Sequence, residues 1–174
     1  MNHKASILSV IVFIATCVSL SCFAQLQSTT PPKGITGTFY VSVDDAAKIY
    51  VNGQKVHDAG VNESRSAEVE LHPADRIVVQ LRDDGGGRRF MMIFASSDQK
   101  TVVSFRHRDF KVVPDIGVTD FKPEEFQKWP KYAIAEKHGK HLPIKSYSEW
   151  IWGDISKCTI AGIVTPEMIK PMPK

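Results

Sequence analysis

Features that would identify a specialised class of protein are scarce in this sequence. The 174 residues include 3 cysteines and 11 glycines, which excludes a collagen-like chain and a small scaffold held together by disulfides. The formal net charge of +3 is too small to favour nucleic acid as a partner. No heptad pattern is sustained, so a coiled coil is excluded as well. The 43% of hydrophobic residues is that of an ordinary folded domain.

The motifs of common enzyme classes are also missing. There is no Gly-x-Ser-x-Gly, no His-Glu-x-x-His and no phosphate-binding glycine loop. The glycine-rich segment Asp83–Arg89 lacks the Lys-Ser/Thr pair of such a loop, and we interpret it as a hairpin connection. His138 and His141 lie in a lysine-rich stretch with too few further zinc ligands, which favours a solvated basic loop. We therefore expect no enzymatic activity and no cofactor.

The longest apolar run lies near the start of the chain and is too short to span a bilayer. Lys4 precedes the uncharged run Ile7–Leu20, whereas a membrane-spanning helix needs roughly 20 apolar residues. Cys22-Phe23-Ala24 then places small residues at positions −3 and −1 of a cleavage site before Gln25. This order is typical of a secretory signal peptide, so we expect residues 1–24 to be removed and the protein to be secreted and extracellular.

Removal of that segment would leave Cys158 as the remaining cysteine. One cysteine makes no disulfide within a monomer, and we expect Cys158 to be a thiol buried in a strand, where it would pack like a small hydrophobe. A chain of about 150 residues can bury enough apolar surface to fold without disulfides.

Between residues 37 and 105, apolar and polar residues alternate in short runs. This period of two predicts β-strands with one core face and one more polar face. The residues expected on the core face are Phe39, Val41, Val43, Ile49, Val51, Ala67, Val69, Leu71, Ile77, Val79, Leu81, Phe90, Met92, Phe94, Val103 and Phe105. Asn52-Gly53 is the clearest hairpin turn between the runs. Short strands spaced this closely predict an all-β antiparallel sandwich or barrel.

The remaining segments set the expected domain boundaries. We expect a flexible lead-in at residues 25–36, a single domain at 37–165 and a proline-rich surface tail at 166–174. The Lys122–Phe126 segment, with Pro123 near its start, predicts one short helical turn. The other expected elements are a long basic loop at 131–146 and closing strands at Glu149–Trp152 and Cys158–Val164.

The run Val43–Gly53, in which Asp44-Asp45 precedes a strand that ends Tyr50-Val51-Asn52-Gly53, resembles a recurring stretch of galactose-binding-like β-sandwich domains. The strand Ala74–Leu81 and its glycine-rich loop are similar to the next part of that pattern. Glu149–Gly153 looks like the closing Trp-Ile-Trp strand of secreted members, among them extracellular matrix and shell-associated proteins. The resemblance implies a jelly-roll sandwich that serves as a sugar-binding module or as an adhesion or matrix module.

One departure from this family pattern concerns its disulfide. Secreted members often pair a cysteine before the helical turn with one in the last strand, where Cys158 stands here. Asp109–Val113 holds no cysteine, so the resemblance implies that this domain depends on its core instead.

Two pairs of adjacent carboxylates are the candidate ligands for a cation. Asp44 with Asp45, and Asp83 with Asp84, could contribute to a calcium site, which needs 6–8 oxygen ligands. Such pairs also form turns, and we favour that interpretation. Calcium is thus the one cofactor that stays open.

Basic, aromatic and glycosylation motifs complete the candidates. Arg88 and Arg89 could form a basic patch with the Arg106–Arg108 run. The lysine-rich loop around His138 and His141 could meet sulfated glycans or an acidic matrix partner. Asn62, in the sequon Asn62-Glu63-Ser64, is the candidate for N-glycosylation. Trp150 and Trp152 lie two apart, so strand alternation places both on one face, and we favour the core over a sugar-stacking surface.

These observations favour a secreted, non-enzymatic module that binds glycan or extracellular matrix. The alternative is a structural component of a secreted organic matrix, mineralised or not, without a discrete ligand site. An exposed aromatic side chain among polar groups in a cleft would favour the first hypothesis over the second.

Overall fold

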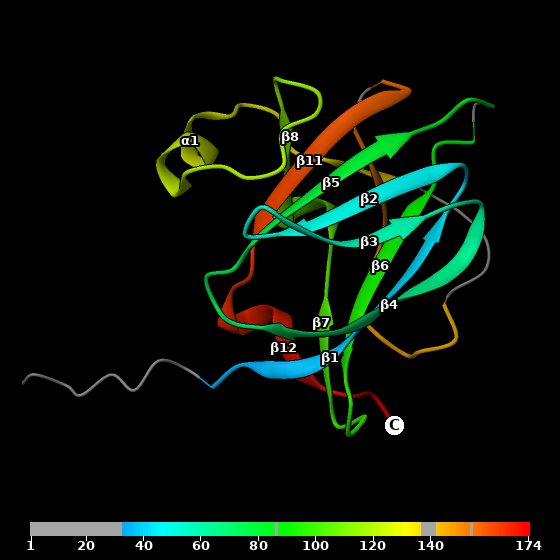
Figure 1. Cartoon of the computed structure of the whole chain (residues 1–174), viewed down its shortest axis with the longest axis vertical. Helices are drawn as coiled ribbons and strands as arrows, with labels where there is room; N and C mark the ends of the chain where they lie inside the picture. Colours follow the sequence, from blue (N-terminus) through cyan, green and yellow to red (C-terminus); the bar gives the residue numbers. More distant parts are fainter. Residues whose placement is uncertain (1–32, 86, 137–141, 154) are drawn as a thin grey trace, which may run out of the picture. The chain divides into compact units, whose positions relative to one another are not determined.

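Two antiparallel sheets build the part of the chain that the computed structural model describes, which is residues 33–85, 87–136, 142–153 and 155–174 (Figure 1). Sheet A has the strand order β12 (Ile169–Pro171), β7 (Thr101–Ser104), β6 (Phe90–Ser96), β1 (Ile35–Val43) and β4 (Asn62–Leu71). Two further strands extend sheet A beside β6: β10 (Trp150–Trp152) pairs with β6, and β9 (Ile134–Glu136) pairs with β10. Sheet B has the order β3 (Gln54–Ala59), β2 (Ala46–Val51), β5 (Arg76–Arg82), β11 (Lys157–Ile163) and β8 (Phe110–Val113). The all-β sandwich is therefore confirmed, and it is compatible with a jelly roll.

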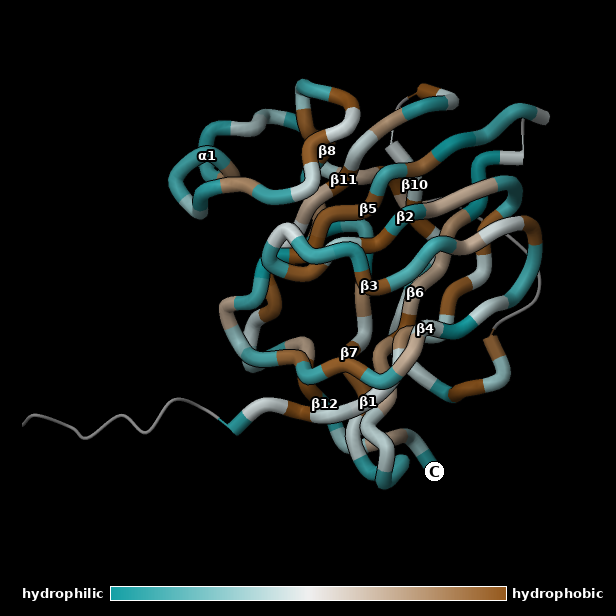
Figure 2. The backbone as a smooth tube through the Cα atoms, viewed as in Figure 1, coloured by the Kyte–Doolittle hydropathy of each residue, from teal (hydrophilic) through white to brown (hydrophobic). Residues whose placement is uncertain are grey.

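The main core lies between the two sheets and consists of the residues that the alternation predicts. Phe39, Val41 and Val43 of β1 are at most 3% exposed, and the inward residues of β2, β5 and β6 pack against them in the same cluster. Figure 2 shows hydrophobic residues along β5 and hydrophilic ones along β3, at the edge of its sheet.

Ala67 is the predicted core residue that the structure places at the surface. The register between β1 and β4 shifts between Thr38 and Tyr40, so Ser66 and Ala67 both lie opposite Phe39 in a β-bulge. Ser66 is buried there and its Oγ accepts a hydrogen bond of 3.0 Å from Phe39 N. The bulge turns Ala67 outward.

The outer faces of both sheets are partly covered, which the prediction of one polar face per strand did not anticipate. All residues of β6 are buried, because Met91 and Ile93 pack under Leu142 and Trp150 in a second cluster. On sheet B, Val78 and Ala161 pack under Phe121 and the side chains of a covering segment that includes α1 (Pro123–Lys128). The helical turn expected at Lys122–Phe126 is thus confirmed, with Pro at its start. No helix in the described part of the chain is long and apolar enough to cross a membrane.

The hairpin turn at Asn52-Gly53 is confirmed. It joins β2 to β3, and both residues adopt positive φ angles, 48° and 82°. An Asn-Gly pair suits this turn because both central residues need a left-handed backbone.

Residues 166–174 lie largely at the surface, as expected, but they belong to the sandwich and do not form a separate tail. They form a short 3-10 helix, Pro166–Met168, and then β12, in which Ile169 pairs with Val103 of β7. Met168 is only 4% exposed. Prolines are compatible with this position because β12 is the edge strand of sheet A.

Candidate functional site

The two predicted acidic pairs meet at one end of the sandwich. The Asp44-Asp45 turn joins β1 to β2, and the loop after β5 leads through Asp83 and Asp84 to β6. Asp44 N donates a hydrogen bond of 2.9 Å to Arg89 O, which ties the two connections together. One carboxylate oxygen each of Asp44, Asp45 and Asp83 lies within 4.8 Å of the others. We call these three side chains the acidic cluster.

Local donors already engage the carboxylates of the acidic cluster. Asp83 Oδ1 accepts hydrogen bonds from Gly85 N at 2.9 Å and Gly87 N at 3.3 Å, and the side chain of Asp83 is fully buried. Asp45 accepts a bond from the backbone N–H of Asp84. These contacts are those of turn-forming carboxylates.

Arginines neutralise part of the charge of the acidic cluster. Arg89 pairs with Asp44, and Arg88 Nε lies 3.9 Å from Asp83 Oδ2. Asp84 points to another partner, Arg82 Nε, at 3.0 Å. Of the six carboxylate oxygens in the acidic cluster, Asp83 Oδ1, Asp45 Oδ2 and Asp44 Oδ1 already have partners. The oxygens left over are fewer than the 6–8 that calcium takes, and a cation would compete with Arg89 for Asp44.

Asn62, the predicted glycosylation residue, lies at the exposed start of β4. Its φ of 80° is in the left-handed region, which asparagine tolerates better than most residues. Ser64 of the same sequon is hydrogen-bonded to His57 Nε2 at 2.8 Å. The sequon is therefore accessible on an edge strand of sheet A.

Both predicted core tryptophans are buried, but they do not share one face. Trp152 is 0% exposed and packs with Ile151 in the main core, whereas Trp150, at 8%, packs in the outer cluster of sheet A. The neighbours Ile151 and Trp152 both reach the main core, so this three-residue strand does not alternate between two faces as the sequence analysis expected. Buried indoles offer no surface on which a sugar could stack.

Cys158 lies in β11 opposite Leu81 and is 2% exposed. It is part of the main core, which agrees with the expectation that this side chain is buried in a strand and packs like a small hydrophobic residue. The histidines His138 and His141 lie outside the described residues.

The predicted basic residues go to different partners. Arg88 and Arg89 contact the acidic cluster, as above. His107 Nδ1 lies 2.7 Å from Glu149 Oε2, and Arg106 N donates a hydrogen bond of 2.8 Å to Asp109 Oδ2. The Arg106–Arg108 run is therefore held at the start of a 3-10 helix, His107–Asp109.

Two carboxylates beside this 3-10 helix have pKa values shifted in opposite directions. Burial raises the pKa of Asp109. Burial also opposes ionisation of Glu149, but hydrogen bonds from the His107 ring and backbone outweigh it and lower the pKa of Glu149. Opposite shifts can indicate an acid and a base in catalysis. Here Asp109 accepts a hydrogen bond from the backbone N–H of Arg106, directly before the 3-10 helix, and Glu149 accepts one from that of His107, its first residue. These bonds favour a role in positioning that helix.

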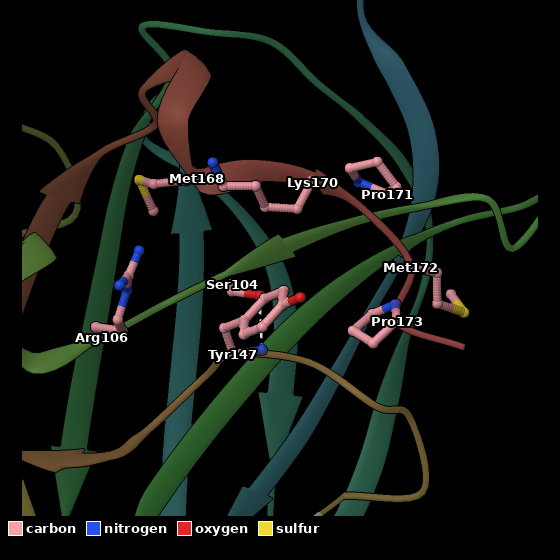
Figure 3. Close-up of a pocket in the computed structure, with 8 residues that line it drawn as sticks. All are labelled: Ser104, Arg106, Tyr147, Met168, Lys170, Pro171, Met172 and Pro173. Atoms are coloured by element: carbon pink, nitrogen blue, oxygen red, sulfur yellow. Dashed lines mark hydrogen bonds between the residues drawn. The ribbon is translucent and has the colours of Figure 1, made fainter.

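A groove on the edge of sheet A is a site that the sequence analysis missed. Its volume is about 490 Å³, within the range of ligand sites. It lies between the end of β7, β12 and the segment that follows Leu142 (Figure 3). The lining residues are Ser104, Arg106, Tyr147, Met168, Lys170, Pro171, Met172 and Pro173. We call it the β7–β12 groove.

Tyr147 is the exposed aromatic side chain of the β7–β12 groove. It is 57% exposed, and its backbone N–H donates a hydrogen bond of 3.1 Å to Ser104 Oγ. Figure 3 shows its ring between Arg106 on one side and Met172 and Pro173 on the other. The tyrosine therefore presents a ring face between charged and apolar walls.

No sequence pattern could have indicated this groove, because its residues come from three separate segments. Ser104 ends β7 and Arg106 follows it, Tyr147 comes directly after the expected long loop at 131–146, and the others belong to the expected tail. The pairing of β12 with β7 and the hydrogen bond from Tyr147 N to Ser104 Oγ bring them together.

Comparison of the chain with protein-family models, with curated proteins and with solved structures found no match. The sandwich fold is therefore the structural support for the resemblance noted in the sequence. The function has to be argued from the sites themselves.

Proposed function

We propose that this chain is a secreted, non-enzymatic module of the galactose-binding-like sandwich type, and that it binds a glycan of the extracellular matrix in the β7–β12 groove. The observation that carries the proposal is the exposed ring of Tyr147 among polar side chains in a groove. Sugars present one apolar face, which stacks on an aromatic ring, and hydroxyl groups, which need hydrogen-bonding partners at the rim.

The groove supplies both kinds of contact. Tyr147 offers the ring, and its hydroxyl can donate or accept a hydrogen bond. Arg106 and Lys170 add further donors at the groove. Met172 and Pro173 complete an apolar wall beside the ring.

Other aromatic side chains are less suitable as platforms. Trp150 and Trp152 are buried. Tyr132 is 54% exposed, but Lys111 Nζ lies 5.2 Å from the centre of its ring and engages that ring in a cation–π contact. This tyrosine is a matched control for Tyr147.

The absence of enzymatic activity belongs to the same proposal. The acidic cluster, Asp109 and Glu149 each use their carboxylates to hold local backbone or arginine groups. A general acid or base instead has to reach its substrate. Secretion rests on the cleavable segment expected at residues 1–24.

Binding to a panel of neutral and acidic matrix oligosaccharides tests the proposal with wild type, Tyr147→Ala and Tyr132→Ala. We expect Tyr147→Ala to weaken binding by about 2- to 10-fold, the value of one aromatic contact, and Tyr132→Ala to leave it unchanged. Absence of glycan binding, with the native protein found in an insoluble matrix, would favour the structural-component hypothesis instead.

A further inference from the structure

We infer that the glycan bound in the β7–β12 groove is acidic and carries carboxylate or sulfate groups; this inference rests on the proposed function. The charge of the groove carries it. Arg106 and Lys170 both line the groove, and no aspartate or glutamate does so among the residues that the structure describes.

The positive charge continues into the two hollows that adjoin the groove. One hollow, of about 420 Å³, shares Tyr147 and Pro173 with the groove, and the other, of about 380 Å³, shares Met172 and Pro173. Lys145 lines both hollows, and again no acidic side chain lines either among the described residues. A chain that extends from the groove along this face would meet further positive charge.

Arg106 is positioned to bind an anion without large rearrangement. Its backbone N–H is held by Asp109 Oδ2 at 2.8 Å, and its Nε lies 3.9 Å from the same oxygen. The side chain still has 27% of its surface exposed. A guanidinium group can bind a carboxylate or a sulfate through two parallel hydrogen bonds, so a partly fixed arginine loses little freedom on binding.

Lys170 contributes a second, more exposed charge on β12. Its side chain is exposed, and it acts electrostatically on Glu167, which does not line the groove. Lys145 Nζ donates a hydrogen bond of 2.8 Å to a backbone carbonyl, that of Lys174. Neither lysine has a salt bridge within the described part of the chain, so an incoming anion would not displace a carboxylate.

The apolar wall identifies a sugar chain as the source of the anionic groups. Met168, Pro171, Met172 and Pro173 line the groove beside Tyr147. A simple inorganic anion has no apolar surface to place against this wall. A uronic acid or a sulfated pyranose has both a ring face and a negative group, which matches the ring and the cations together.

Affinity measurements on matched ligands test the inference. The probes are a neutral oligosaccharide, an oligouronate, a sulfated oligosaccharide and polyaspartate. Comparison of the oligouronate with the sulfated oligosaccharide separates carboxylate from sulfate, and comparison of the oligouronate with polyaspartate separates sugar from peptide. We expect at least one acidic oligosaccharide to bind about tenfold tighter than the neutral one at low salt, and this advantage to shrink at high salt because ions screen exposed charges.

Substitutions then locate the charge effect. We expect Lys170→Gln and Arg106→Gln each to weaken binding of the acidic oligosaccharide by roughly 3- to 10-fold. Binding of the neutral one should weaken less, because glutamine keeps a hydrogen-bond donor and loses only the charge. Lys48→Gln removes an exposed charge from β2 in the other sheet and should change neither. Thermal unfolding of each variant verifies its fold, and Lys170, being exposed, gives the variant least prone to misfold.

Each contrary outcome has one meaning. Equal affinity for neutral and acidic oligosaccharides, still dependent on Tyr147, would overturn the inference and leave the proposed function in place. Absence of binding to any glycan would overturn both. An equal loss in Lys48→Gln and Lys170→Gln would overturn the inference, because the charge effect would then be spread over the surface. So would polyaspartate binding that matches the glycan and does not depend on Tyr147.

Discussion

The ion pair between Arg76 and Asp120 has the most complete geometry among the side-chain pairs described. Arg76 Nε and Nη2 donate hydrogen bonds of 2.7 and 3.0 Å to the two oxygens of Asp120. The pair joins β5 to the segment that covers the outer face of sheet B. The hydrogen bonds from Arg76 hold the pKa of Asp120 below its ordinary value.

Asp120→Asn should therefore destabilise the protein in a pH-dependent way. A carboxyl group whose pKa is lower in the folded state contributes its stability above its unfolded pKa, which is about 3.9, and loses it as the pH falls through the folded pKa. Since the pair is partly exposed, we expect a cost of about 1 kcal/mol at pH 7. Denaturant unfolding of wild type and variant from pH 7 to pH 3 measures it. If the difference in free energy of unfolding between wild type and Asp120→Asn stays the same as the pH falls, Asp120 stabilises the protein through something other than its charge.

The tryptophans should differ in their contribution to stability. Trp152 lies in the main core at 0% exposure and its Nε1 donates a hydrogen bond of 2.9 Å to Ile155 O. Trp150 is in the outer cluster, and its Nε1 has no hydrogen-bond partner among the described residues. We expect Trp152→Ala to cost about 5 kcal/mol and Trp150→Ala about 3 kcal/mol in denaturant unfolding. A Trp150→Ala variant as stable as wild type would mean that this side chain belongs to a binding surface.

The acidic cluster should respond to calcium only when its arginine is removed. Arg89 pairs with Asp44, so we expect millimolar calcium or a chelator to leave the thermal midpoint of wild type unchanged. In Arg89→Ala the carboxylates lose this counter-charge, and calcium should raise the midpoint, because a ligand that binds only the folded state stabilises it. A calcium-dependent midpoint in wild type would show that the cluster binds the cation despite Arg89.

A strand could be predicted from the sequence where one of its faces is buried and the other is more polar, because apolar and polar residues then alternate. In β1, Phe39, Val41 and Val43 alternate with more polar residues and all three reach the core. The outer face of β6 could not be predicted, because Met91 and Ile93 are buried by a segment about fifty residues further along the chain. Local alternation reports on a strand, but the cover over its second face depends on the tertiary fold.

The candidate sites divide in the same way. Asp44, Asp45 and Asp83 are visible as turn-forming acidic pairs, and the connections between sheets bring them within 4.8 Å. Tyr147 and Lys170 carry no local motif, and the proline content of residues 166–174 argued against a strand there. Pro171 is nevertheless accommodated, since an edge strand has no further neighbour to bond.

Strand β12 should be necessary for stability as well as for the groove. Val102 and Val103 of β7 are 0% exposed, and Met168 precedes β12 in the main core. We expect truncation of residues 166–174 to lower the free energy of unfolding by about 2–4 kcal/mol, through the lost burial of Met168 and the exposure of β7. Replacement of Lys170 by Gln, which keeps the strand, is the control. An unchanged unfolding midpoint after truncation would return this segment to the status of a tail.

At the scale of the whole domain, each of the two outer faces of the sandwich is partly covered by a chain segment. Residues around α1 cover sheet B, and Leu142 with its neighbours covers sheet A. The segment over sheet A also supplies Tyr147 and Lys145 to the groove and its adjoining hollows. The same chain segment thus covers part of a hydrophobic face and forms part of the proposed binding surface. Substitutions in this segment can therefore affect both stability and binding.

At the scale of the whole molecule, the proposed function also depends on secretion, which is a prediction that can be tested together with Asn62. The order Lys4, an apolar run and Cys22-Phe23-Ala24 predicts cleavage before Gln25. Asn62 is exposed at the start of an edge strand, so a chain that enters a eukaryotic secretory pathway should carry an N-glycan there. We expect secreted material to begin at or near Gln25 and to lose mass on enzymatic removal of N-glycans, and Asn62→Gln to abolish that loss.

N-terminal sequencing that finds Met1 in the secreted protein would refute the cleavage. A mass loss that persists in Asn62→Gln would place the glycan elsewhere, and a protein retained inside the cell would remove the extracellular glycan as its natural partner.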